Sequence, residues 1–172
     1  MRLKSVTEES RDIVYDRMKE AFPYEERRDK EDWIKLFDCE RYKCMFIVDE
    51  KEIQIGFAAW WEYDEFIFLE HLAINGECRG HGYGTEFLNF FRVICNKPII
   101  LEVEFPVTEQ AIKRIEFYRK ADFYLNDKYE YYQPSYHGKE SLPLILMSTV
   151  PLDEDKVKTF VKTTLASCYK NN

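Results

Sequence analysis

The sequence has 172 residues, which is close to the usual size of one domain and short for two. With 45% hydrophobic and 16% aromatic residues it can bury a sizeable core, which excludes a disordered chain although 33% of the residues are charged. A formal net charge of −7 disfavours nucleic acid and anionic membranes as partners. These numbers predict one acidic globular domain.

No stretch approaches the roughly 18 apolar residues of a membrane span, and the start, Met1 to Ser5, lacks the apolar region of a secretory signal. We therefore expect a cytoplasmic protein. The five cysteines are widely spaced, with no Cys-x-x-Cys pair and no histidine at metal-ligand spacing. This pattern predicts reduced thiols and no metal site.

The first forty residues are expected to hold a short strand and two helices. Residues 2–6 are typical of a strand, and Ser5 or Thr7 is placed to cap a helix that Pro23 ends. A charged stretch over 24–30 leads to a second short helix around Trp33.

The middle of the chain changes to the period of strands. Residues 44–49, 54–63 and 66–75 are separated by short turns and predict three consecutive antiparallel strands. A glycine-rich segment follows, and then a helix whose apolar side chains recur on one face (Phe87, Leu88, Phe91, Ile94 and Cys95). The glycines therefore lie between a strand and the start of a helix.

The last third alternates strands and helices. Strands are expected over 99–105, 123–132 and 142–149, with a helix over 108–120 carrying Ala111, Ile112, Ile115 and Tyr118 on one side. The strands 66–75 and 99–105 could lie parallel, because strand, helix and strand in series form a crossover unit. A final helix begins near Asp153 or Asp155.

The segment Arg79-Gly80-His81-Gly82-Tyr83-Gly84-Thr85 is the most informative motif. Three glycines at alternate positions let successive N–H groups point inward, and such a nest at a helix start binds anions. It is neither a Walker loop nor a complete dinucleotide fingerprint. A simple tight connection is the alternative.

At these residues the sequence resembles the GCN5-related N-acetyltransferases (GNAT superfamily), whose signature is matched by Arg79, Gly82 and Gly84. The strand 69–75 is similar to the family's fourth strand and 101–104 to its fifth. The segment 115–123 is similar to the family's helix-to-strand segment that carries a tyrosine, although Asp122 replaces a glycine, which suggests a positive φ there. Ala111 stands where many members carry Asn.

The resemblance implies a mixed α/β single domain over 1–150, with the acyl-CoA N-acyltransferase fold. Its twisted sheet would have six to seven mostly antiparallel strands, a parallel splayed pair at the fourth and fifth, and helices on both faces. The helix within 151–172 would pack on the same domain or serve a dimer contact.

The resemblance also implies acetyl-CoA as cosubstrate, with no metal. Its pyrophosphate would lie in the nest and its pantetheine arm along the fourth strand. The implied cofactor-binding residues are Leu72, Ala73, Ile74, Arg79, Gly80, His81, Gly82, Tyr83, Gly84 and Thr85.

Two catalytic residues follow from the same resemblance. Glu70 matches the position of a general base that acts through water, and Tyr118 matches the tyrosine that protonates the coenzyme A thiolate. A backbone N–H near Leu72 would stabilise the oxyanion. The plainer alternatives are that Glu70 pairs with a Lys or Arg and that Tyr118 is a core aromatic.

Other titratable residues leave alternatives open. Glu102 and Glu104 alternate along one strand and could bind a cationic amine or act as the base. Strand alternation predicts that His71 points away from Glu70, and we expect His81 to face solvent or the phosphates. His137 belongs to an aromatic loop, and a nucleophilic Cys78 beside His81 is a weak third possibility.

We therefore expect an N-acetyltransferase that moves the acetyl group of acetyl-CoA directly to a primary amine, in a ternary complex. A non-catalytic acyl-CoA binding or sensing module is the alternative. The acceptor would be a small molecule or a peptide, bordered by residues 22–30 and 133–141, and the protein a monomer or homodimer.

Overall fold

The computed structural model describes residues 1–134, 136 and 140–169. The chain divides into two compact units, Met1–Lys97 and Pro98–Asn172. The candidate His137 lies outside the described residues.

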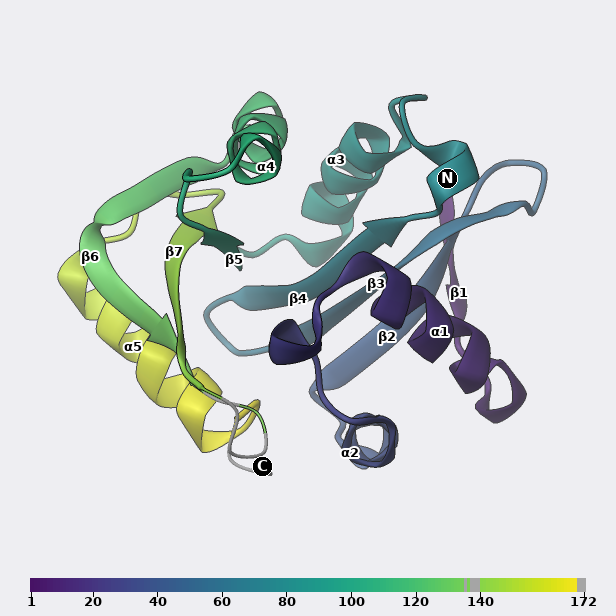
Figure 1. The fold of residues 1–172 in the computed structure, drawn as a ribbon, viewed down its shortest axis with the longest axis horizontal. Coiled ribbons are helices and arrows are strands. Elements are labelled where there is room, and N and C mark those ends of the chain that lie inside the picture. The colour runs from purple at the N-terminus through teal and green to yellow at the C-terminus, as the bar shows by residue number, and fades with distance from the viewer. Residues whose placement is uncertain (135, 137–139, 170–172) are drawn as a thin grey trace. The chain divides into compact units, whose positions relative to one another are not determined.

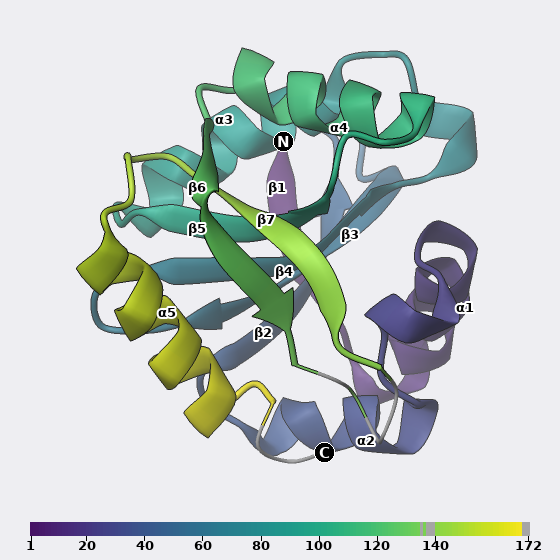
Figure 2. The same ribbon diagram turned by 60° about the vertical axis from the view of Figure 1, so that its left-hand side comes forward.

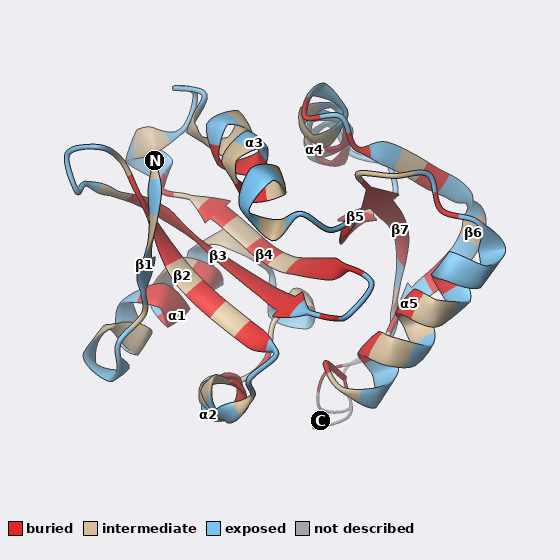
Figure 3. Ribbon diagram, turned by 180° about the vertical axis from the view of Figure 1, so that it is seen from behind, coloured by how far each residue is buried: buried red, intermediate tan, exposed pale blue. Residues whose placement is uncertain are grey.

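The first unit is a four-stranded antiparallel sheet in the order β1-β2-β3-β4. Helix α1 lies over one face of these strands and α3 over the other (Figures 1 and 3). Its elements are β1 (Arg2–Ser5), α1 (Arg11–Ala21), α2 (Lys30–Lys35), β2 (Tyr42–Val48), β3 (Gln54–Glu62), β4 (Ile67–Ile74) and α3 (Tyr83–Cys95), with short 3-10 turns at Glu8–Ser10, Tyr24–Glu26, Leu36–Asp38 and Gly76–Cys78.

Aromatic side chains fill both faces of the first unit. Trp60 of β3 packs edge-on against Phe91 of α3, with ring centroids 5.0 Å apart, and both are buried. On the opposite face, the indole N–H of Trp33 in α2 donates to the Tyr42 hydroxyl at 2.8 Å. These contacts hold α2 and α3 on the sheet, because each buried aromatic side chain removes a large apolar area from water.

Close backbone approach requires glycine at one position of β3. A Cβ on Gly56 would lie 2.2 Å from the carbonyl oxygen of Ala73 in β4. Because that oxygen belongs to the backbone, it cannot swing aside. The absence of a side chain at Gly56 therefore allows β3 to pair closely with the C-terminal end of β4.

The second unit is a three-stranded antiparallel sheet in the order β5-β7-β6, with two helices (Figure 2). Its elements are β5 (Ile99–Glu104), α4 (Glu109–Lys120), β6 (Tyr124–Gln133), β7 (Leu142–Ser148) and α5 (Glu154–Ala166). Thr108 and Asp153 cap the two helices, accepting from the N–H groups of Ala111 at 3.1 Å and Lys156 at 2.9 Å.

Helix α5 packs on the sheet of the second unit. The ring of Phe160 lies 5.8 Å from that of Tyr131 in β6, and the Leu152 N–H donates to the Asn126 side chain at 3.0 Å. The helix predicted within 151–172 is thus in the same unit as β6 and β7.

The predicted mixed α/β class, with mostly antiparallel strands and flanking helices, is confirmed. Asp122 has a φ of +60°, as its replacement of a glycine suggested. Ile112 differs from expectation, since it is 43% exposed on α4. Among the described residues, no helix combines the length and apolar character needed to cross a bilayer.

Candidate functional site

The glycine-rich loop forms an open turn at the start of α3. Gly80 and Gly82 have φ values of +78° and +84°, and Gly82 is the N-cap of α3. A Cβ built on either glycine would meet no atom within 4 Å. The first N–H groups of a helix have no partner inside it, so the loop presents donors beside open space. This arrangement suits the pyrophosphate of a nucleotide, because it combines aligned donors with the positive end of a helix dipole.

The side chain of His81 folds onto the loop backbone. Its Nδ1 lies 2.9 Å from the Arg79 carbonyl oxygen and 3.3 Å from that of Cys78, so the Nδ1–H is the donor. Both hydrogen bonds of this ring nitrogen are to backbone carbonyl oxygens and not to the Cys78 thiol. Nothing in this geometry makes Cys78 a nucleophile.

The end of β4 is joined to the loop by Arg79. The Asn75 N–H donates to the Ile55 carbonyl of β3 at 2.9 Å, so by alternation the N–H and C=O of Ile74 point toward the other edge of β4. The Arg79 Nε donates to that Ile74 carbonyl at 3.0 Å. The edge predicted to hold the pantetheine arm is therefore continuous with the predicted phosphate loop.

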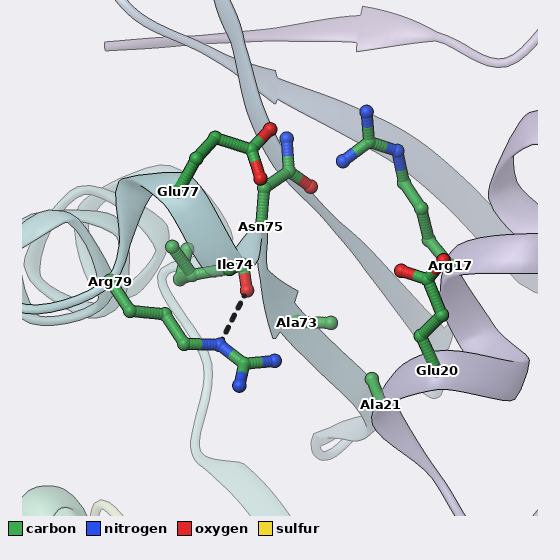
Figure 4. A pocket seen from close by; sticks show the side chains of 9 residues that line it. Arg17, Glu20, Ala21, Ala73, Ile74, Asn75, Glu77 and Arg79 are labelled. Carbon is green, nitrogen blue, oxygen red and sulfur yellow. Dashed lines mark hydrogen bonds between the residues drawn. The ribbon is translucent and has the colours of Figure 1, made fainter.

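A pocket opens between α1 and the end of β4. Figure 4 shows the side chains of Arg17 and Arg79 on opposite sides of it, with Asn75 between them. Its lining residues are Arg17, Glu20, Ala21, Ala73, Ile74, Asn75, Gly76, Glu77 and Arg79. The pocket is thus continuous with the loop and with the predicted cofactor edge of β4.

A β-bulge interrupts β4 at Glu70. Ala59 pairs with His71 while its neighbour Trp60 pairs with Leu69, so Glu70 is the extra residue. The expectation that His71 points away from Glu70 is therefore wrong: the bulge places both side chains toward the segment before α2, with His71 Nδ1 3.9 Å from Glu70 Oε2.

The Glu70 carboxylate is buried in an ion pair. Its side chain and that of Arg28 are each only 2% exposed, and the Arg28 guanidinium donates to Oε1. The indole N–H of Trp61 donates to Oε2 at 2.9 Å. Burial acts to raise the pKa of Glu70, but the charge of Arg28, then that of His71 when it is protonated at low pH, and these hydrogen bonds lower it to about 2. Glu70 is therefore ionised at neutral pH and holds a proton only weakly.

His71 holds the same segment through its other ring nitrogen. Its Nε2 lies 3.2 Å from the Glu26 carbonyl oxygen, and its ring meets Phe22 edge-on at 4.6 Å. Burial lowers the pKa of His71, so the ring is neutral at pH 7. Nε2 then carries the proton, and Nδ1 is buried without a hydrogen bond in the described structure.

Tyr118 lies near the end of α4, between the rings of Phe117 and Phe123 at 5.0 Å and 5.6 Å. Burial raises its pKa to about 12, with Arg114 lowering it and Glu104 raising it further. The phenol is protonated at neutral pH, which a proton donor requires.

The two carboxylates of β5 have different partners. Glu102 accepts from the hydroxyls of Tyr131 and Tyr169 and from the Gln133 side chain at 2.8 Å. Glu104 pairs with Arg114 of α4. Both carboxylates are thus held by protein groups, and Tyr169, which follows α5, ties the C-terminal segment to β5.

Sequence reasoning missed the importance of Arg28. It placed this residue in a polar segment bordering the acceptor, whereas its side chain is among the largest that are fully buried. A run of charges before a tryptophan carries no signal for a buried cation. Within residues 1–134, 136 and 140–169, no cluster of three or more His, Cys, Asp or Glu side chains could hold a metal ion.

Comparison with known proteins identifies relatives of this chain. The family model described as "Acetyltransferase (GNAT) family" matches residues 9–123. A structure from Bacteroides thetaiotaomicron, named as an acetyltransferase of the GNAT family, is 32% identical, with a TM-score of 0.89 over 98% of both chains.

Two further matches are more limited. YjbC of Bacillus subtilis (strain 168), named as an acetyltransferase, is 35% identical over 112 residues, which are 63% of this chain and 55% of that protein, so the match spans about half of its length. An aminoglycoside 6'-N-acetyltransferase solved with coenzyme A is 16% identical, with a TM-score of 0.58, over 90% of this chain and all of that one. At this low identity, the match to the aminoglycoside 6'-N-acetyltransferase indicates a shared fold only.

Proposed function

Because the chain belongs to the GNAT family of acetyltransferases, we propose that it transfers the acetyl group of acetyl-CoA to a primary amine. One observation carries the cosubstrate assignment: the open turn at Gly80 and Gly82 leads into the N-terminus of α3. A pyrophosphate needs backbone donors and a helix dipole more than it needs net positive charge. The charge of −7 is therefore compatible with this ligand.

In the proposed complex, the pyrophosphate lies against the N–H groups from Gly80 to Thr85. The pantetheine arm follows the edge of β4 from Leu72 to Ile74. The Ile74 carbonyl already accepts from Arg79, so the other backbone groups along this edge are the ones proposed to pair with the arm. The thioester then lies toward the bulge at Glu70.

The proposed reaction is a direct transfer. The neutral amine nitrogen attacks the thioester carbonyl carbon and the C–S bond breaks. The nitrogen releases one proton to solvent, and solvent returns one proton to Tyr118 after Tyr118 has protonated the thiolate. A backbone N–H near Leu72 stabilises the developing oxyanion. The Tyr118 phenol donates its proton to the leaving thiolate, and its raised pKa of about 12 keeps it in the donor form.

The amine must lose a proton, and Glu70 was the predicted base. Its burial, its ion pair with Arg28 and its pKa of about 2 weigh against that role. A base works best when its pKa lies near the working pH. We therefore propose that the neutral fraction of the amine reacts, so that the rate rises as the acceptor loses its proton.

A second candidate is an acyl-CoA binding module without catalysis. The observation that favours it is that Glu70, Glu102 and Glu104 are all held by protein side chains. Both candidates should be stabilised thermally by acetyl-CoA, because any ligand of the folded state raises its stability.

The experiment offers acetyl-CoA with a panel of amines, comprising a polyamine, an aminoglycoside and a lysine-containing peptide, and measures release of free thiol. Amine-dependent thiol release supports the enzyme. Thermal stabilisation by acetyl-CoA without thiol release from any amine would support the binding module instead.

A further inference from the structure

The segment Phe22–Asp29 is fastened to β4 at three points. Arg28 enters the ion pair with Glu70, the Glu26 carbonyl accepts from His71, and Phe22 packs against the His71 ring. Each of these contacts is made to one of the two side chains that the bulge turns to the same face. The bulge therefore places the two β4 side chains that bind this segment.

The segment is also fastened to α1. The Tyr15 hydroxyl donates to the Arg28 carbonyl at 3.1 Å and accepts from Arg27 at the same distance. Between these fixed residues, Tyr24 and Glu25 are exposed. The segment is thus held at its ends while its middle faces solvent.

We propose that Glu70 is a positioning residue: by holding Arg28 it fixes segment Phe22–Asp29 as a wall of the acceptor site, and it does not take the amine proton. This inference rests on the proposed function, which places the thioester toward the bulge. The carboxylate cannot approach a substrate amine without breaking its buried ion pair with Arg28, which is costly.

Several groups that face Glu70 come from different elements of the described structure. They are Arg28 from the segment before α2, Trp61 from β3, His71 from β4, and Tyr42 and Cys44 from β2. Of these, Arg28 is the cation that compensates the carboxylate, since the buried His71 is neutral. Replacing Arg28 should therefore separate a positioning role from that of a base.

The test compares Glu70→Gln, Arg28→Met and the double variant, using the most active amine of the panel. If Glu70 positions the segment, each single variant breaks the buried ion pair and leaves the charge of one partner in place. We expect each to lower kcat/KM for the amine about tenfold or more, chiefly through KM, while KM for acetyl-CoA stays within about twofold. The double variant removes both charges and should recover most of the loss.

A general base predicts a different pattern. The double variant would then be as impaired as Glu70→Gln, because the base is missing in both. Arg28→Met would free Glu70 to bind protons at higher pH, and the acid limb of the kcat profile would move upward. Absence of recovery in the double variant, or a loss in Glu70→Gln confined to kcat, overturns the proposal.

Tyr15→Phe gives an independent measure if a charge variant fails to fold. It removes both hydrogen bonds of the Tyr15 hydroxyl to the segment and leaves the Glu70 ion pair in place. Positioning predicts a higher KM for the amine with an unchanged pH profile of kcat, whereas an unchanged KM contradicts it. The matched control is Glu154→Gln with Lys158→Met, an exposed ion pair on α5. Wild-type protein that releases no thiol with any amine would refute the proposed function itself.

Discussion

Gly82→Ala tests the phosphate loop most directly. Gly82 has a φ of +84°, and a residue with a Cβ pays about 1–2 kcal/mol in that conformation. No atom lies within 4 Å of the new Cβ, so no steric cost is added within the protein. For a chain of this length the loss corresponds to a fall in Tm of about 2–8 °C. In the proposed complex, the added Cβ would lie beside the pyrophosphate.

The assay measures Tm and the Kd for acetyl-CoA in parallel. We expect the affinity to fall about tenfold, equivalent to about 1.4 kcal/mol, because the methyl group displaces the phosphate from its donors. Gly76→Ala is the matched control, since its Cβ also meets no atom within 4 Å but its φ is not positive. The reasoning is refuted if Gly82→Ala binds acetyl-CoA as well as wild type, or if Gly76→Ala lowers Tm equally.

Three further predictions concern other parts of the chain. Tyr118→Phe should lower kcat on the order of 100-fold in the thiol-release assay with little change in KM; an unchanged kcat would remove Tyr118 from the mechanism. The stabilisation that comes from ionised Glu70, with its pKa lowered from 4.5 to about 2, is complete above pH 4.5 and is lost as the pH falls toward 2. In denaturant unfolding, the stability of wild type relative to the Arg28→Met, Glu70→Gln double variant should therefore fall by about 1 kcal/mol between pH 6 and pH 3.5, and a constant difference would contradict the lowered pKa. Asp153→Ala should lower the free energy of unfolding by about 1 kcal/mol, because the N-cap of α5 is lost. Asp155→Ala, in the same helical turn, should lower it by less than about 0.5 kcal/mol. Equal losses in the two variants would show that Asp153 does not act as a cap.

The elements could be predicted because local signals mark them. The strand expected over 66–75 is β4, Ile67–Ile74, and the helix expected over 108–120 is α4, Glu109–Lys120. Proline, glycine and the change of hydrophobic period act over a few residues, so a single sequence displays them. The positive φ of Asp122 followed from a comparison with one family position.

The environment of Glu70 could not be predicted in the same way. Alternation assumes a regular strand, and the bulge breaks that assumption at one residue without a local signal in the sequence. Arg28 is 42 residues away along the chain, and the sequence offered several other cations as partners. Which cation is buried depends on tertiary packing, which also decides that Ile112 is exposed.

Because β4 carries an extra residue, the position of the proposed acceptor wall depends on the number of residues in this strand. Shortening β4 by one residue at the bulge would restore a regular pleat, in which the flanking residues keep their present partners and adjacent side chains point to opposite faces. Glu70 and His71 could then no longer hold the same segment, even if every other residue were retained. Among related chains, insertions and deletions near this point should therefore alter the acceptor wall more than most substitutions do.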